Sequence, residues 1–490
     1  MLAATAAGLF GALSADAYTL PLPWGDRRID ADGRVEIRHV EGVDRGTARQ
    51  RPLGRARLRV GADLTSRLRF EGAVTGSAGG TPRNADRAGA FDFDHSLQDL
   101  SPSLDVEEAR LDLTVPNLDV SAGIQKFAWG KLDETQPNDL LNPEKYYDFL
   151  LDDEDERKIG VPALAVTGYV PDLPSSAAPR DLKLTGVWLP LVVPFRFPDE
   201  DERWYPPLAR VPESTRSGGV VVSNHVDFRN AEVPDRDLEN SGAAVRLAGY
   251  ASGADFSLYY FDGFDTGPAL DVAARAFARR NPESGRGVDV RSEIEVFPVF
   301  DRIRAAGADL AYAVFGATLR AEGAWVQGRL FPRSIRDVIE SREVGPVDPA
   351  MLRPDVELEV PVRLMPATVE RDAIEWGAGG DALYGDTFVL LQVNQTVVLH
   401  NHESLLVSDR ETRFGLTLRR SFLADGLEAE LEGLYGMQGV YGVAHPRVTY
   451  DLMDGIDVRL GFVAIEGHEQ SLLGQYREND EGYVRIRYLF

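Results

Sequence analysis

Hydrophobic and polar residues alternate at every second position in short segments that recur along the whole chain. In RARLRVGADL, Ala56, Leu58 and Val60 fall on one side of the chain, whereas Arg57 and Arg59 fall on the other. A period of two predicts β-strands that each have one apolar and one polar face. Repeated dyads of about ten residues are typical of transmembrane β-barrels, so the pattern predicts an all-β fold.

The predicted strands are joined alternately by short and long connections. Residues 64–66 and 116–119 form short connections, whereas residues 131–158, 193–240 and 331–368 form long ones. Short turns on one rim and long loops on the other indicate an outer-membrane barrel, with periplasmic turns and extracellular loops. We therefore predict a transmembrane antiparallel up-and-down β-barrel of about eighteen strands, within a range of about 16–18.

Other architectures fit the chain less well. A soluble β-helix or β-propeller requires a sequence repeat of fixed period, and we find none. A β-sandwich is not expected to alternate short and long connections so regularly. No segment reaches the ~20 apolar residues of a membrane-spanning helix. The best apolar run, VWLPLVVPF at 187–195, contains two prolines.

The final octet, YVRIRYLF, alternates in the same way, with an aromatic or aliphatic residue at every second position back from Phe490. In a closed barrel the last strand pairs with the first, which removes both sheet edges. We expect this strand to complete such a closure. Phe490, Tyr488 and Ile486 also resemble the signal that the outer-membrane assembly machinery reads.

The first seventeen residues, MLAATAAGLFGALSADA, are small and apolar and end in an Ala-x-Ala sequence. This pattern predicts a secretory signal peptide at 1–17, although the usual basic n-region is missing, and a disordered Ala-rich tail is the alternative. The predicted organisation continues with an N-terminal segment at 18–33 and the barrel at 34–490. Residues 131–158 would form a constriction loop within the barrel.

Composition removes several classes of function. The chain contains no cysteine, which excludes zinc fingers, thiol nucleophiles, iron–sulfur clusters and disulfides. Its net charge of −25, from 53 basic and 78 acidic residues, argues against binding to nucleic acid. We expect no cofactor and no metal. The acidic runs at 152–157 and 198–203 would lie in outer loops, where they would repel anionic solutes.

The polar faces of the strands supply candidate selectivity residues in the lumen. Six arginines on the first and last strands would converge only if the barrel closes, and a row of glutamates would face them from another wall. Opposed charges across a pore select solutes electrostatically. The alternative is that these charges only pair with each other and fill the lumen. The candidates are Arg57, Arg59, Arg67, Arg69, Arg485, Arg487, Glu428, Glu430 and Glu432.

Residues 131–158 form a long connection with apolar residues of its own, so we expect it to fold into the barrel. The surrounding stretches WGKLDETQPNDLLNPEKYY, DDEDERKIGVPALAVTGY and GVWLPLVVPFRFP resemble a family of outer-membrane porins long filed as a domain of unknown function, sometimes likened to alginate-export barrels. The resemblance implies an outer-membrane barrel and transport. The W-G…N-P motif residues, Trp129, Gly130, Asn142 and Pro143, would end a strand and direct the loop inward.

The sequence therefore predicts a porin-like channel in the outer membrane of a Gram-negative bacterium, for passive or facilitated passage of a small polar, anionic or hydrophobic solute. Its expected partners are that solute, outer-membrane lipid and lipopolysaccharide, and the barrel assembly machinery. A conduit or docking partner for an exporter of lipids or other hydrophobes remains an alternative.

A barrel enzyme of the lipase type is the less favoured reading. His400, His402 and Ser404 share one predicted loop, but nothing at defined spacing would orient them, so we predict no catalytic residue.

Overall fold

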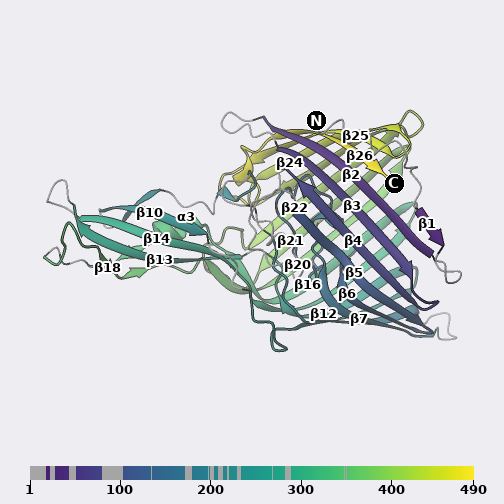
Figure 1. Cartoon of the computed structure of the whole chain (residues 1–490), viewed down its shortest axis with the longest axis horizontal. Helices are drawn as coiled ribbons and strands as arrows, with labels where there is room; N and C mark the ends of the chain where they lie inside the picture. The colour runs from purple at the N-terminus through teal and green to yellow at the C-terminus, as the bar shows by residue number, and fades with distance from the viewer. Residues whose placement is uncertain are drawn as a thin grey trace.

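The computed structural model shows a large β-barrel from which a smaller sheet extends at one end (Figure 1). The barrel wall is a closed ring of eighteen antiparallel strands, which confirms the predicted number. The structure describes residues 18–21, 28–43, 51–79, 103–133, 135–171, 179–196, 198, 203–207, 213–217, 220–228, 233–267, 269–281, 288–346, 348 and 350–490. The predicted signal peptide, 1–17, lies outside the described residues.

The strands follow one another around the wall in chain order, apart from elements that belong to the smaller sheet. The first barrel strand begins at Arg28, six residues earlier than expected. The wall strands are β2 (Arg28–Gly42), β3 (Arg51–Asp63), β4 (Leu68–Ala78), β5 (Ser103–Val115), β6 (Leu118–Gln125), β7 (Val161–Tyr169), β8 (Arg180–Leu189), β11 (Gly242–Ala251), β12 (Ala254–Phe264), β15 (Arg302–Val314), β16 (Ala317–Pro332), β20 (Thr368–Tyr384), β21 (Thr387–Val398), β22 (Arg410–Phe422), β23 (Leu427–Gly436), β24 (Tyr441–Met453), β25 (Ile456–Gly467) and β26 (Glu481–Leu489).

The ring closes between β26 and β2, as the alternation of the final octet predicted. The antiparallel register runs from Arg34 opposite Leu489 to Gly42 opposite Glu481. Two further backbone bonds end the seam, because Gly33 N donates to Phe490 O at 2.8 Å and Phe490 N donates to Gly33 O at 2.9 Å. Closure leaves neither β2 nor β26 as a free edge.

The two faces of the wall differ in polarity. On β2 and β26, Ile37 and Ile486 are about half exposed on the outside, while Arg38 and Arg485 are buried on the inside. Leu58 and Leu258 likewise present apolar side chains outward. A closed ring with an apolar outside and a charged inside is the architecture of outer-membrane barrels. The predicted fold class and location are therefore confirmed.

We had expected the long connections to be irregular loops, but three of them contain regular strands. Together they build a five-stranded sheet of β9 (Ser214–Ser217), β10 (Val220–Phe228), β13 (Ala269–Arg280), β14 (Val288–Val299) and β18 (Leu358–Val360), which extends away from the barrel (Figure 1). Its β10–β14 pairing is parallel. The helix α3 (Ile335–Glu340) buries Val338 and Ile339 in a core with Ile294 and Val296. These connections contain enough apolar residues to form their own cores.

Smaller elements complete the described structure. They are β1 (Tyr18–Pro21), which pairs with β2, the strands β17 (Glu343–Val344) and β19 (Val362–Arg363), the helix α2 (Glu154–Arg157) and the 3₁₀ turn η4 (Gly474–Tyr476). Within the described ranges, no helix is long and apolar enough to span a membrane.

Gly33 provides a test of the closing seam. A Cβ atom there would lie 2.7 Å from the carbonyl oxygen of Arg57 and 2.5 Å from Cζ of Phe490. We expect Gly33→Ala to lower the free energy of unfolding by about 1–3 kcal/mol, because a packed site must absorb an extra methyl group. Urea titration of the barrel in lipid vesicles, followed by heat-modifiable gel migration, measures this change.

The matched control is Gly186→Ala in β8, where a Cβ atom has open space around it. This substitution should change the free energy of unfolding by no more than about 0.5 kcal/mol. Equal stability of the two variants would contradict the seam packing described above.

Candidate functional site

The connection between β6 and β7 crosses the inside of the barrel. Its first half contacts β15, β16 and β21, and its second half contacts β2 and β3. In the ring order, β16 stands nine steps from β3, which is halfway around eighteen strands. Residues 131–158 therefore join opposite walls of the lumen.

The Trp-Gly part of the motif turns the chain off β6. Trp129 is buried and its ring lies 5.7 Å from that of Tyr259 on β12. Gly130 has a φ of +116°, which side-chain-bearing residues rarely adopt. Beyond this turn, Glu322 of β16 accepts hydrogen bonds from the backbone amides of Lys131 at 2.6 Å and Leu132 at 3.3 Å. One wall carboxylate thus holds the first part of the loop.

The Asn-Pro part of the motif ties the middle of the loop to its two ends. Asn142 is buried; its Oδ1 accepts from Phe127 N at 2.7 Å and its Nδ2 donates to Ile159 O at 2.8 Å. The carbonyl of Pro143 accepts from Ile159 N at 2.8 Å. Residues 144–157 therefore form an excursion whose base is fixed beside the wall, and near that base Tyr146 N donates to Arg196 O at 2.8 Å.

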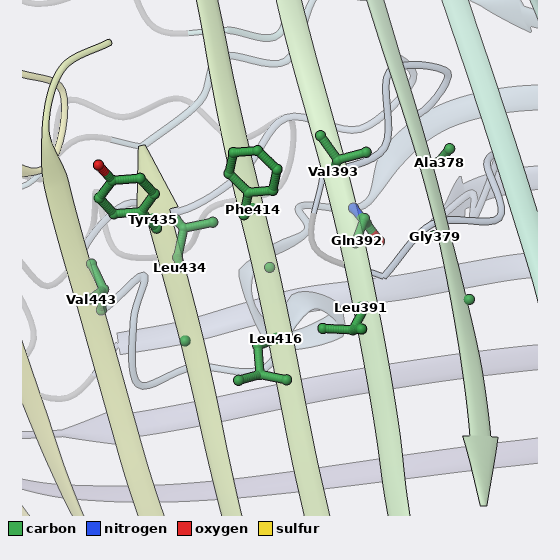
Figure 2. A pocket seen from close by; sticks show the side chains of 13 residues that line it. Ala378, Gly379, Leu391, Gln392, Val393, Phe414, Leu416, Leu434, Tyr435 and Val443 are labelled. Carbon is green, nitrogen blue, oxygen red and sulfur yellow. The ribbon is translucent and has the colours of Figure 1, made fainter. Parts of the chain in front are cut away.

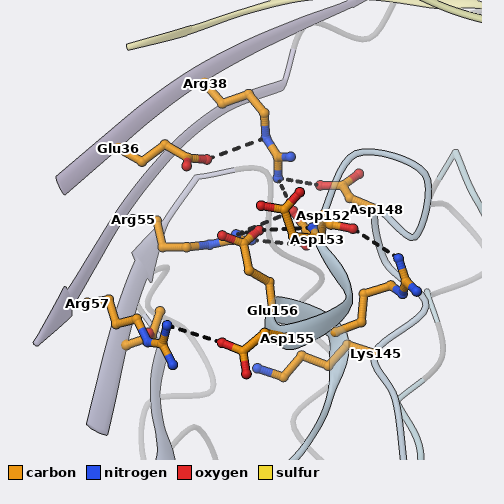
Figure 3. Close-up of polar contacts among 12 residues, drawn as sticks. Glu36, Arg38, Arg55, Arg57, Lys145, Asp148, Asp152, Asp153, Asp155 and Glu156 are labelled. Carbon is orange, nitrogen blue, oxygen red and sulfur yellow. Dashed lines mark hydrogen bonds and ion pairs between the residues drawn. The ribbon is translucent and has the colours of Figure 1, made fainter. Parts of the chain in front are cut away.

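That excursion places the acidic run against arginines of β2 and β3 (Figure 3). Arg38 Nη2 donates to Asp152 Oδ1 at 2.8 Å and to Asp148 Oδ2 at 3.3 Å. Arg55 donates to both oxygens of Asp152, at 3.3 and 3.2 Å, and to Glu156 Oε2 at 3.3 Å. These contacts cover the arginines with carboxylates of the same chain.

Asp152 is held in its charged form by these neighbours. Burial alone would raise the pKa of its carboxyl, but Arg55 and Arg38 outweigh burial and hold that pKa well below the usual range. Asp139, elsewhere in the loop, behaves differently. Burial raises the pKa of Asp139 to about 7 in spite of its ion pair with Lys158. Because the pKa of Asp152 is so low, its contact with the arginines is an ion pair at any physiological pH.

These contacts correct one expectation and reveal residues that the sequence did not single out. The run at 152–157 was expected in an outer loop, and that was wrong, because it lies inside the barrel. Arg34, Arg38 and Arg55 were not predicted as site residues, although they occupy polar positions of the strand dyads. Arg34 also forms an ion pair with Glu156. Only the complementary charge of a distant segment could have indicated them.

Most of the predicted arginines are paired with carboxylates. Arg57 lies 2.7 Å from Glu107 and 3.2 Å from Asp155, and Arg487 lies 2.7 Å from Asp457. Arg485 is buried but reaches its nearest carboxylate oxygens only at 3.9 and 4.0 Å. For these positions, pairing describes the lumen better than a continuous row of free charge.

The arginines near the short-turn rim behave differently from one another. Arg69 binds three carboxylates, those of Asp30, Asp63 and Glu71. Arg67 lies in the exposed turn before β4 rather than on the lumen wall. Arg59 forms no ion pair with any described residue.

The predicted glutamate row does not face the arginines across the pore. Its strand, β23, is separated from β3 only by β2, β26, β25 and β24. Glu430 and Glu432 bind Arg447 of the neighbouring strand, with Glu430 at 2.7 Å, and Glu428 lies 3.9 Å from Arg419. The residues predicted as an assembly signal lie at the seam, where Tyr488 stacks on Phe490 with ring centroids 5.8 Å apart.

A groove of about 710 Å³ lies across β20–β24 (Figure 2). Its most exposed side chains, Leu391, Phe414 and Tyr435, point outward. Gln392, next to Leu391 in sequence, instead contacts the loop inside the barrel, where its side chain accepts from Asp133 N at 3.0 Å. The exposed apolar side chains of the groove therefore belong to the lipid-facing surface, whereas Gln392, Leu434 and Val443, which also line it, face the interior.

The histidine-containing loop carries no assembled catalytic group. Glu403 pairs with Arg333 at 2.5 Å, and no bond joins His400 or His402 to Ser404 in the part of the chain that the structure describes. Across the same residues, no three His, Asp or Glu side chains are grouped so as to hold a metal ion.

No protein-family model and no curated protein matches the chain, so the resemblance built on the W-G…N-P motif stays a prediction. Solved structures that are similar to it include OccAB1 of Acinetobacter baumannii, with 10% identity over 95% of this chain and 96% of that chain and a TM-score of 0.49. OpdK of Pseudomonas aeruginosa with vanillate has 10% identity over 95% and 98%, with a TM-score of 0.48. A BenF-like porin from Pseudomonas fluorescens has 9% identity over 95% of this chain and 98% of that chain, and its TM-score is also 0.48. At this level of similarity, the solutes of those proteins do not transfer to this chain.

Proposed function

We propose that the chain is an outer-membrane channel for small polar solutes and that its lumen favours anions. The observation that carries this proposal is a charged lumen in which some guanidinium groups lack a carboxylate partner. Among the described residues, Arg59 has no ion pair, and the side chain of Arg459 donates to the hydroxyl of Thr449, at 2.9 Å, but pairs with no carboxylate. Such groups can attract an anion without first breaking an ion pair.

The neighbourhood of Arg459 strengthens the preference. Arg459 stands directly opposite Arg485 in the β25–β26 register, and Arg487 is the next inward residue along β26. Two carboxylates are nearby: Asp457, which is closest to Arg487, and Glu36, which lies 3.9 Å from Arg485. Conduction requires several weak sites rather than one tight site, which partly neutralised guanidinium groups supply.

The loop at 131–158 is the proposed constriction. It crosses between opposite walls and carries both apolar and charged contacts into the lumen. Residues whose side chains hold this loop, such as Glu322 and Asn142, would keep the aperture narrow.

Deletion of residues 144–156 tests the channel function and the constriction together. Pro143 and Ile159 are already joined by a backbone hydrogen bond, so Arg157 and Lys158 can close the shortened loop without moving the strands. We expect a single-channel conductance about twofold or more above wild type in planar bilayers, because the pore diameter sets the conductance of an aqueous pore. Unchanged conductance in a folded barrel would contradict the constriction, and no conductance in either protein would contradict the channel.

A paired substitution tests the anion preference. Arg59→Gln with Arg459→Gln should move the reversal potential toward cation selectivity in a gradient of potassium chloride, because both changes remove positive charge from the lumen. The shift should shrink as salt rises, since charges in water are screened over ~10 Å at 0.1 M. The control is Arg275→Gln with Arg279→Gln, an equal charge change on exposed positions of the five-stranded sheet. The anion preference would be overturned if the control variant showed an equal shift of the reversal potential. It would also be overturned if the Arg59→Gln, Arg459→Gln variant showed no shift at low salt.

A further inference from the structure

The carboxylates of the loop are bound in the way that arginines bind a carboxylate ligand. Asp152 receives hydrogen bonds on both oxygens from Arg55, at 3.3 and 3.2 Å, and one more from Arg38 at 2.8 Å. Glu156 shares Arg55 with it and also meets Arg34. Two-point binding by guanidinium groups is a geometry that planar carboxylates favour.

We propose that Arg34, Arg38 and Arg55 form a binding site for a dicarboxylate solute and that Asp152 and Glu156 occupy this site as an internal substitute for it. This inference rests on the proposed channel function and deepens it. The solute competes with the loop for the arginines, and its binding releases the excursion at 144–157 from the wall.

The charges of the wall explain why the loop does not leave without a replacement. Among the described residues, the wall carboxylates that form ion pairs with Arg34, Arg38, Arg55 or Arg57 are Glu36 and Glu107, and these also lie near Arg485 and Lys126. Withdrawal of the loop therefore leaves more cationic groups than these two carboxylates can neutralise. Uncompensated buried charge is strongly unfavourable, so an incoming anion must supply the missing negative charge.

The choice of a dicarboxylate follows from the sharing of Arg55. The two bound carboxylates lie side by side on one guanidinium group, with Arg38 and Arg34 on the outer sides. A solute with one carboxylate can replace Asp152 or Glu156, but not both. A solute with two carboxylates satisfies the same donors at once.

The loop is built so that this part can move while its base stays fixed. Asn142 and Pro143 bind Ile159 and Phe127 at the base, and none of these contacts involves the arginines. Several contacts stand against release. Phe149 packs on Trp204 with ring centroids 5.2 Å apart, Lys145 pairs with Asp105, and Asp155 pairs with Arg57 at 3.2 Å. Protonation does not release Asp152 at physiological pH, because the arginines keep its carboxylate ionised, whereas burial and the neighbouring Asp152 raise the pKa of Glu156.

Liposome swelling with succinate and with glucose tests the proposal in the full-length protein. The variant Asp148→Asn, Asp152→Asn, Glu156→Gln removes the internal carboxylates and keeps the arginines. We expect its rate for succinate, relative to glucose, to exceed that of wild type by about fivefold or more, the lower end of typical coupling between sites. Heat-modifiable migration confirms that the variant barrel is folded.

Two further variants separate the possible explanations. Asp235→Asn, Asp237→Asn, Glu239→Gln removes the same three charges from exposed positions and should match wild type. Arg38→Gln with Arg55→Gln also frees the loop but destroys the site, so it should raise succinate and glucose rates equally.

The outcomes distinguish this inference from the channel function. Equal acceleration of succinate and glucose in the first variant would overturn the dicarboxylate site, because the loop would then be only an obstruction. If glucose passes while the succinate rate of the first variant stays equal to that of wild type, the dicarboxylate site is also overturned. This result would leave the channel function standing. No passage of either solute through any variant, including the deletion of 144–156, would overturn the channel function itself.

Discussion

The structure depends on one constraint, which is that every strand in a bilayer must bond to a neighbour on both sides. The pairing of β26 with β2 satisfies this constraint and turns a sheet into a ring. Once the ring is closed, each strand has a lipid-facing side and a lumen-facing side. Alternation in the sequence then fixes which side chains meet lipid, and it places Arg38, Arg55 and Arg485 inside.

The enclosed arginines create a second constraint. Positive groups buried inside a narrow barrel need negative partners. The wall provides some of them, such as Glu107 for Arg57 and Asp457 for Arg487. The loop provides the others, through Asp152 and Glu156. The strong net negative charge of the chain is therefore partly internal, and it holds a connecting segment across the lumen.

Local patterns account for what could be predicted from the sequence. Strands of period two and the division of faces need only near-neighbour information, and both were predicted correctly. The pairing of the last strand with the first joins the two ends of the chain, but it could be predicted because a membrane barrel must have no free edge. The five-stranded sheet was missed because its β10–β14 pairing joins segments that are far apart in the chain. The position of the acidic run was wrong for a similar reason. Its partners, Arg38 and Arg55, lie about a hundred residues away, with separations of 114 and 97 to Asp152.

The same distinction applies to the candidate site. The contacts of Asn142 and Pro143 are local to the loop and its ends, and a motif can indicate contacts of this kind. Partners in an ion pair could not be identified from the sequence, since charge alone does not say which arginine meets which carboxylate. Arg69, with three partners, and Arg59, with none among the described residues, have equivalent positions in their dyads.

The most direct measurement is chemical cross-linking of the loop to both walls, in a chain that has no cysteine of its own. One pair, Asp133→Cys with Gln392→Cys, joins the first half of the loop to β21, and the other, Asp152→Cys with Arg55→Cys, joins the second half to β3. A loop that crosses the lumen predicts that a short bifunctional thiol reagent links both pairs in the folded barrel. If the reagent labels the cysteines of both variants but links neither pair, the crossing of the lumen by the loop is contradicted.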